Sequence, residues 1–174
     1  MFDGWAGYNQ VMRALLLLAA CTLTACGTGP MLRVSYVDPV LRADFEHVQN
    51  ELNARLGMVA VATNASDPLG WRITQNTERV KAYNREQNER AVAFCDYSTT
   101  QIFVMDPRDS SGVVGQQNTG VVKSFLRATI AHELGHAMGL SHADHGIMKP
   151  FNRECVDKEA ECLATALRAD GAIE

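Results

Sequence analysis

Hydrophobic residues in the middle of the chain recur at two spacings, one typical of strands and the other of helices. Residues 32–37, LRVSYV, nearly alternate between apolar and polar positions, which predicts a strand. The next apolar residues follow at steps of three and four, which predicts a helix that starts at Asp38-Pro39 and ends at Gly57. The apolar stripe of this packing helix consists of Leu41, Phe45, Val48, Leu52 and Leu56.

Four further short segments predict strands that this helix would cover. They are residues 58–62, 71–75, 91–95 and 101–105. The polar residues 76–90 predict a solvated loop or a short helix, and residues 109–120, rich in Ser, Gly and Gln, predict a loop. A second long helix is predicted over 121–138 and ends at Gly139, because glycine readily adopts the left-handed backbone of a helix end. A C-terminal helix is predicted over 152–168 with Asp157 as its N-cap. Together these elements predict an α+β domain with a mixed, twisted sheet of four to five strands.

Length and composition fit one globular domain. The chain has 174 residues, of which 47% are hydrophobic and 21% charged. Its net charge of -4 argues against a protein that binds nucleic acid by neutralising phosphates, so no nucleic-acid partner is expected. A monomer is expected.

The N-terminal residues predict an export signal. Residues 14–25, ALLLLAACTLTA, carry no charge and follow Arg13; twelve residues are too few to span a bilayer but suit a signal peptide. The tetrapeptide ending at Cys26 resembles the bacterial lipoprotein signal, in which a cysteine is lipidated and becomes the new N-terminus. We therefore expect a signal peptide over 1–25, a lipidated N-terminus and short tether over 26–30, and the folded domain over 31–174. Met12 is an alternative start, Cys21 an alternative lipidation site, and a buried N-terminal helix an alternative to export.

Export would leave three cysteines in an oxidising compartment: Cys95, Cys155 and Cys162. An odd number predicts one disulfide and one free thiol, with the pairing left open. Cys155 and Cys162 would lie about 10 Å apart on one helix, too far for a bridge, so a pair that includes Cys95 is given at least equal weight.

Candidate metal ligands lie on the second long helix. His132 and His136 are four residues apart and therefore project from one helix face, close enough to hold one metal ion. Glu133 can reach a water on that ion without occupying a coordination position. His142 follows three residues after Gly139 and can turn back as a third ligand. Three neutral imidazoles leave a fourth tetrahedral position open, which is the arrangement of a catalytic zinc site.

The run HELGHAMGLSH, followed by Met148 in GIMKP, resembles the metzincin metalloproteases, whose signature is HExxHxxGxxH with a methionine-containing turn. The resemblance covers these 17 residues closely and the order of the predicted elements more loosely. It implies a zincin-like fold, Zn²⁺ held by His132, His136 and His142, Glu133 as general base, and Met148 beneath the metal. The implied activity is that of a zinc-dependent endopeptidase, which hydrolyses peptide bonds through a zinc-bound water and acts on a peptide or protein substrate. The substrate would lie along a sheet edge, which the family layout places at residues 91–95. The lipoprotein signal would place the enzyme in a bacterial cell envelope, anchored by lipid on the periplasmic side or the cell surface.

Several features depart from that family pattern. Only five residues separate His142 from Met148, and no tyrosine follows the methionine. Asp144 and His145 compete with His142 as third ligand, although the spacing favours His142. Residues 94–97 are candidates for shaping the pocket, with ordinary strand packing favoured. Two alternative functions stay open: a noncatalytic zinc-binding envelope lipoprotein, against which the intact Glu133 speaks, and an amide hydrolase acting on peptidoglycan stem peptides.

Overall fold

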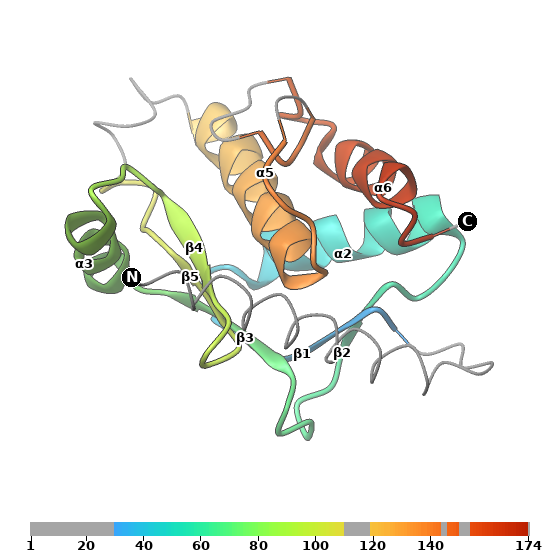
Figure 1. The fold of residues 1–174 in the computed structure, drawn as a ribbon, viewed down its shortest axis with the longest axis horizontal. Helices are drawn as coiled ribbons and strands as arrows, with labels where there is room; N and C mark the ends of the chain where they lie inside the picture. Colours follow the sequence, from blue (N-terminus) through green and yellow to red (C-terminus); the bar gives the residue numbers. More distant parts are fainter. Residues whose placement is uncertain (1–29, 110–118, 144–145, 150–153, 174) are drawn as a thin grey trace, which may run out of the picture.

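A computed structural model describes residues 30–109, 119–143, 146–149 and 154–173. These residues form an α+β domain with a mixed five-stranded sheet in the order β2-β1-β3-β5-β4 (Figure 1). The strands are β1 (Leu32–Val37), β2 (Val61–Thr63), β3 (Trp71–Gln75), β4 (Ala93–Asp96) and β5 (Gln101–Val104). Strands β2, β1, β3 and β5 run parallel, whereas β4 pairs antiparallel with β5 and forms an edge of the described sheet. The predicted fold class is confirmed.

Two strands begin later than their hydrophobic runs predict, and an asparagine side chain binds the backbone near each start. The Oδ1 atom of Asn53 accepts hydrogen bonds from the main-chain N–H groups of Ala60 and Val61, at 2.9 and 3.0 Å. Asn84 binds both the N–H and the carbonyl of Ala91 at 2.8 Å. These side chains satisfy backbone polar groups near the strand starts. The strands β2 and β4 start at Val61 and Ala93 instead of at 58 and 91.

The packing helix α2 (Arg42–Leu56) begins one turn later than predicted. Asp38 is not its N-cap, since its carboxylate accepts from the N–H of Val40 at 3.2 Å and its carbonyl accepts from Leu41 at 2.9 Å, which makes a separate turn. The predicted end is confirmed, because Gly57 has a left-handed backbone with φ 66°. Residues Phe45, Val48 and Leu52 of the apolar stripe are fully buried.

Helices cover both faces of the sheet (Figure 1). Helix α2 lies with α5 (Thr119–Ala137) and α6 (Glu159–Ala169) on one face, where the main core forms. Helix α3 (Thr77–Gln87) occupies the polar stretch after β3, with the Asn76 side chain capping its N-terminus. It covers the other face, where a smaller cluster contains Val80, Phe94, Phe103 and Met105.

The C-terminal helix α6 is shorter than predicted. It starts at Glu159, with Lys158 as N-cap, and Asp157 adopts a left-handed backbone with φ 64° instead of capping the helix. Cys155 therefore lies in the turn before α6 and forms a disulfide with Cys162, with their Cα atoms 6.0 Å apart. The 10 Å separation expected for one continuous helix does not apply, and a disulfide that includes Cys95 is ruled out. Cys95 is a free thiol within the described part of the chain.

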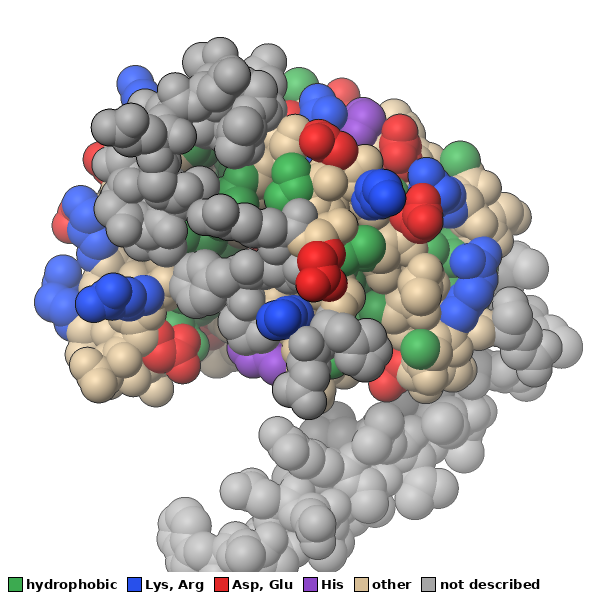
Figure 2. Space-filling view, turned by 90° about the horizontal axis from the view of Figure 1, so that it is seen from above, with side chains coloured by type: hydrophobic (Ala, Val, Ile, Leu, Met, Phe, Trp, Pro, Cys, Tyr) green, Lys and Arg blue, Asp and Glu red, His purple; other side chains and the backbone are tan. Residues whose placement is uncertain are grey.

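Acidic and basic side chains are intermingled over the face shown in Figure 2. Among the described residues, no helix is both long and apolar enough to cross a membrane. The predicted signal peptide, Cys26 and Cys21 lie outside the described residues, as do Asp144 and His145.

Candidate metal centre

The three histidines of the sequence motif converge on one point. His132 and His136 project from the same face of α5, and their Nε2 atoms are 3.1 Å apart. The chain then turns at Gly139, whose φ of 97° is one that glycine adopts without strain, and this turn brings His142 back over the helix. The ring centre of His142 lies 5.3 Å from the ring centre of His132 and 4.6 Å from that of His136. One nitrogen of each ring lies within 4.8 Å of the others, so the three can hold a metal ion.

Main-chain carbonyls fix the orientation of the two helical rings. The Nδ1 atom of His132 lies 2.6 Å from the Ile147 carbonyl oxygen, and that of His136 lies 2.8 Å from the Leu140 oxygen. A carbonyl only accepts, so each Nδ1 carries the proton and donates, which leaves the Nε2 lone pairs facing each other. Burial lowers the pKa of His132 to about 4 and also lowers that of His136, which keeps both rings neutral.

This arrangement fits a bound zinc ion. Zinc–nitrogen bonds in tetrahedral geometry place the coordinating nitrogens about 3.3 Å apart. The separation of 3.1 Å between the two Nε2 atoms is close to that value. Two neutral imidazoles whose lone pairs oppose each other would repel without a cation between them. The donor set therefore has the chemistry of a metal site.

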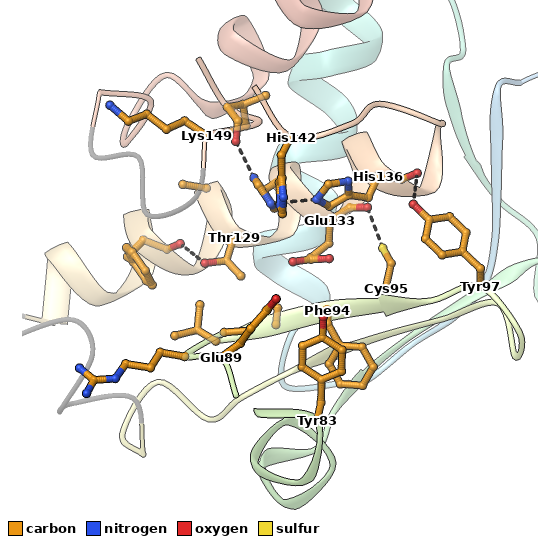
Figure 3. A pocket seen from close by; sticks show the side chains of 18 residues that line it. Tyr83, Glu89, Phe94, Cys95, Tyr97, Thr129, Glu133, His136, His142 and Lys149 are labelled. Atoms are coloured by element: carbon orange, nitrogen blue, oxygen red, sulfur yellow. Dashed lines mark hydrogen bonds between the residues drawn. The ribbon is translucent and has the colours of Figure 1, made fainter. Parts of the chain in front are cut away.

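Glu133 is buried beside the histidines and faces the pocket. Glu133 is 5% exposed, and its Oε2 atom has no hydrogen-bond partner among the described residues. Burial raises the pKa of Glu133 to about 7. Figure 3 shows its carboxylate below His136 and His142, directed into the space between α5 and β4. A carboxyl group of near-neutral pKa can both take up and release a proton at physiological pH.

Met148 packs beneath this part of α5. It is 3% exposed, and a Cβ atom added at Gly135 would lie 2.5 Å from its sulfur. Gly135 lies between the two helical histidines in the sequence, so the absence of a side chain there lets the methionine approach the helix backbone. The structure thus places Met148 under the residues that carry the imidazoles.

A pocket of about 490 Å³ lies in front of the histidines, between α5 and the edge strand β4. Phe125, Ala128 and Thr129 of α5 form one wall, and Phe94, Cys95 and Tyr97 form the opposite side. Lys149 lines the rim, but its side chain points away from His136 and His142 (Figure 3). The sequence favoured ordinary strand packing for residues 94–97, but Phe94, Cys95 and Tyr97 also line the pocket.

Sequence reasoning missed the part of the pocket that α3 contributes. Tyr83 lines the pocket and stacks on Phe94, with ring centres 4.2 Å apart, and Glu89 lies near it. Tyr83 is about fifty residues from the HExxH motif, and its helical segment is polar. No local sequence signal connects it to the histidines, since only the sheet topology brings α3 beside β4.

Similarity to known proteins is weak and covers part of the chain. No protein-family model matches the chain. Over 94 residues it is 33% identical to the snake venom metalloproteinase acutolysin-C of Deinagkistrodon acutus. The match covers 50% of this chain and 22% of that protein, so the chain matches less than a quarter of the relative's length. This similarity and the three-histidine cluster fit a metalloprotease.

Proposed function

We propose that this chain is a zinc-dependent endopeptidase of the metzincin type. The observation that carries the proposal is the set of converging imidazoles, two of them with Nδ1 held by main-chain carbonyls, beside a buried carboxyl group with a free oxygen. Structural zinc sites are closed by four protein ligands, whereas catalytic sites keep one position open. The described residues supply three ligands and a carboxyl group positioned for proton transfer, which favours catalysis.

Each residue of the site has a role in peptide hydrolysis. His132, His136 and His142 would hold the metal, and Met148 would support the helix from below. Zinc, when bound, supplies Lewis-acid polarisation of the scissile carbonyl and makes a coordinated water more acidic. Glu133 would accept a proton from the attacking water at its carboxylate and return it to the departing amine nitrogen. Burial raises the pKa of this carboxyl group, which favours its uptake of a proton.

The substrate would be an extended peptide segment. Strand β4 has a neighbour on one side only in the described sheet, and the pocket opens along it. Main-chain pairing to such an edge holds a peptide extended and presents alternate side chains to the protein. The apolar wall formed by Phe125 and Ala128 favours an apolar substrate side chain next to the cleaved bond.

The test is zinc content and proteolysis of the purified protein and of Glu133→Gln. We expect about one zinc per chain for both proteins, cleavage of an unfolded protein by the wild type, and loss of that cleavage in the variant or with a chelator. Glu46→Gln, an exposed carboxylate on α2, is the matched control and should cleave normally. Cleavage that survives Glu133→Gln would refute the mechanism.

The same experiment separates the alternatives. A wild type that binds zinc but cleaves nothing would favour a noncatalytic zinc-binding lipoprotein. Release of stem peptides from peptidoglycan without cleavage of proteins would favour an amide hydrolase.

We also propose that the chain is exported and lipid-anchored through Cys26, as its N-terminal signal predicts. Two acyl chains would give lasting attachment to a membrane. Expression in bacteria should place the wild type in the membrane fraction and Cys26→Ala in the soluble fraction. Equal membrane association of both proteins would contradict the anchor.

A further inference from the structure

Two side chains that line the pocket, one in β4 and one in the turn directly after it, bind the backbone of α5. The Cys95 thiol donates a hydrogen bond to the main-chain oxygen of Glu133 at 3.2 Å. The Tyr97 hydroxyl donates to the main-chain oxygen of His136 at 2.9 Å. Figure 3 shows both side chains rising from the strand toward the helix. The two acceptors belong to the carboxyl residue and one of the histidines of the candidate site.

The two donors lie two residues apart in the chain, and the two acceptors lie three residues apart on α5. Cys95 belongs to β4, and Tyr97 lies in the turn directly after it. Carbonyls three apart on a helix are separated by about 4.5 Å along its axis and lie near one another around it. Two contacts at these spacings restrict both the distance and the relative tilt of strand and helix, whereas one contact would leave the tilt free.

Both donors are held in place. Burial raises the pKa of the Cys95 thiol, so it remains protonated and able to donate. Tyr97 is 60% exposed, but its ring packs edge-on against Trp71, with ring centres 5.7 Å apart. The His136 oxygen also accepts from the Gly139 N–H at 2.9 Å, so the tyrosine binds where the helix ends and the chain turns toward His142.

We propose that Cys95 and Tyr97 are positioning residues that set the separation between the substrate-binding strand and the metal-binding helix. We call this pair the strand–helix clamp. The inference rests on the proposed function, because it concerns how a peptide on β4 is aligned with Glu133 and the metal. Without the clamp, α5 could shift against β4, and the carboxylate and the third histidine would lose their alignment.

Single substitutions test each half of the clamp. Tyr97→Phe keeps the ring beside Trp71 and removes only the hydroxyl, so we expect the zinc affinity to fall about 5- to 10-fold in competition with a chromophoric chelator. Cys95→Ala should lower kcat about 5-fold with KM changed by less than about 2-fold, because alignment and not binding is affected. Cys95→Ser restores a donor and should recover most of kcat.

Two controls separate positioning from general stability. Tyr36→Phe removes a hydroxyl from β1, outside the pocket lining, and should leave zinc affinity unchanged. Val48→Ala creates a cavity in the core of α2 and should lower Tm without lowering zinc affinity.

The clamp is overturned if Tyr97→Phe and Cys95→Ala keep wild-type zinc affinity and kcat, or if Val48→Ala weakens zinc binding as much as Tyr97→Phe. A wild type that binds zinc and cleaves peptides while the clamp variants are unaffected refutes the clamp alone. A wild type that binds no zinc refutes the proposed function as well.

Discussion

Two buried carboxyl groups have an oxygen without a hydrogen-bond partner among the described residues, and their surroundings differ. Glu133 lines the pocket beside the histidines, and its Oε2 atom is buried. Glu159 lies at the start of α6 and is 4% exposed. Its Oε1 atom is 3.9 Å from His47, and Arg127 nearby is already paired with Asp44 at 2.8 Å. We propose a catalytic role for the first carboxyl group, whereas we expect the second to lower stability.

The amount by which Glu159 lowers the free energy of unfolding should depend on pH. Burial raises the pKa of its carboxyl, with Asp157 acting in the same direction and His47 and Arg127 against it. The folded protein therefore keeps this proton at pH values where the unfolded chain has lost it, and the contribution of Glu159 to stability falls as pH rises above about 4.5.

We expect Glu159→Gln to raise the unfolding free energy by about 1 kcal/mol at pH 7 and to leave it unchanged near pH 4, as measured by urea denaturation. Glu161→Gln, whose side chain is 56% exposed on the same helix, should change stability by less than about 0.5 kcal/mol at either pH. An equal gain from Glu159→Gln at both pH values would show that ionisation is not the cause.

At the scale of elements, the disulfide joins the turn before α6 to the helix itself. Cys155 is 1% exposed and packs in the main core with Met148 and Leu163. A Cβ atom at Gly135 would contact both Met148 and Leu163, so α6, the methionine and α5 are packed together. The disulfide therefore holds the start of the element that supports the site from below.

The loop that this disulfide closes is short, since the two cysteines are seven residues apart. Chain-entropy arguments give about 2.5 kcal/mol for a loop of this size. We expect the double variant Cys155→Ala, Cys162→Ala to lose roughly that amount in urea unfolding. A thiol reductant should bring the wild type to the level of the variant and leave the variant unchanged. A wild type whose stability does not respond to the reductant would show that the disulfide contributes little.

At the scale of the whole molecule, the site joins segments that only folding brings together. Helix α5 supplies two histidines, the turn after it supplies the third, and the edge strand supplies the opposite side of the pocket. A ligand that binds this assembled set and not the unfolded chain stabilises the whole domain.

Zinc should therefore raise the thermal stability of the protein. At a free concentration of about 1,000 times Kd, the gain is about 4 kcal/mol, which corresponds to roughly 10 °C in Tm for a domain of this size. Differential scanning calorimetry should show this shift and its reversal by a chelator. His136→Ala should abolish the shift. An equal shift in that variant would mean that zinc binds elsewhere.

Local patterns predicted most of the elements and the candidate ligands. The strands at Leu32–Val37 and Trp71–Gln75 have the predicted bounds, because alternation along a strand is a local property. The end of α2 at Gly57 likewise depends on one residue's backbone freedom. The spacing of His132 and His136 places both on one face of any helix.

The order of most elements, the fold class and the residues that carry the candidate chemistry therefore follow from local patterns in the sequence. The pairing of Cys155 with Cys162 and the contacts of Cys95 and Tyr97 with α5 became evident only in the folded structure. The physical reason is that periodicity and backbone preference act over a few residues, whereas these contacts depend on where distant segments pack.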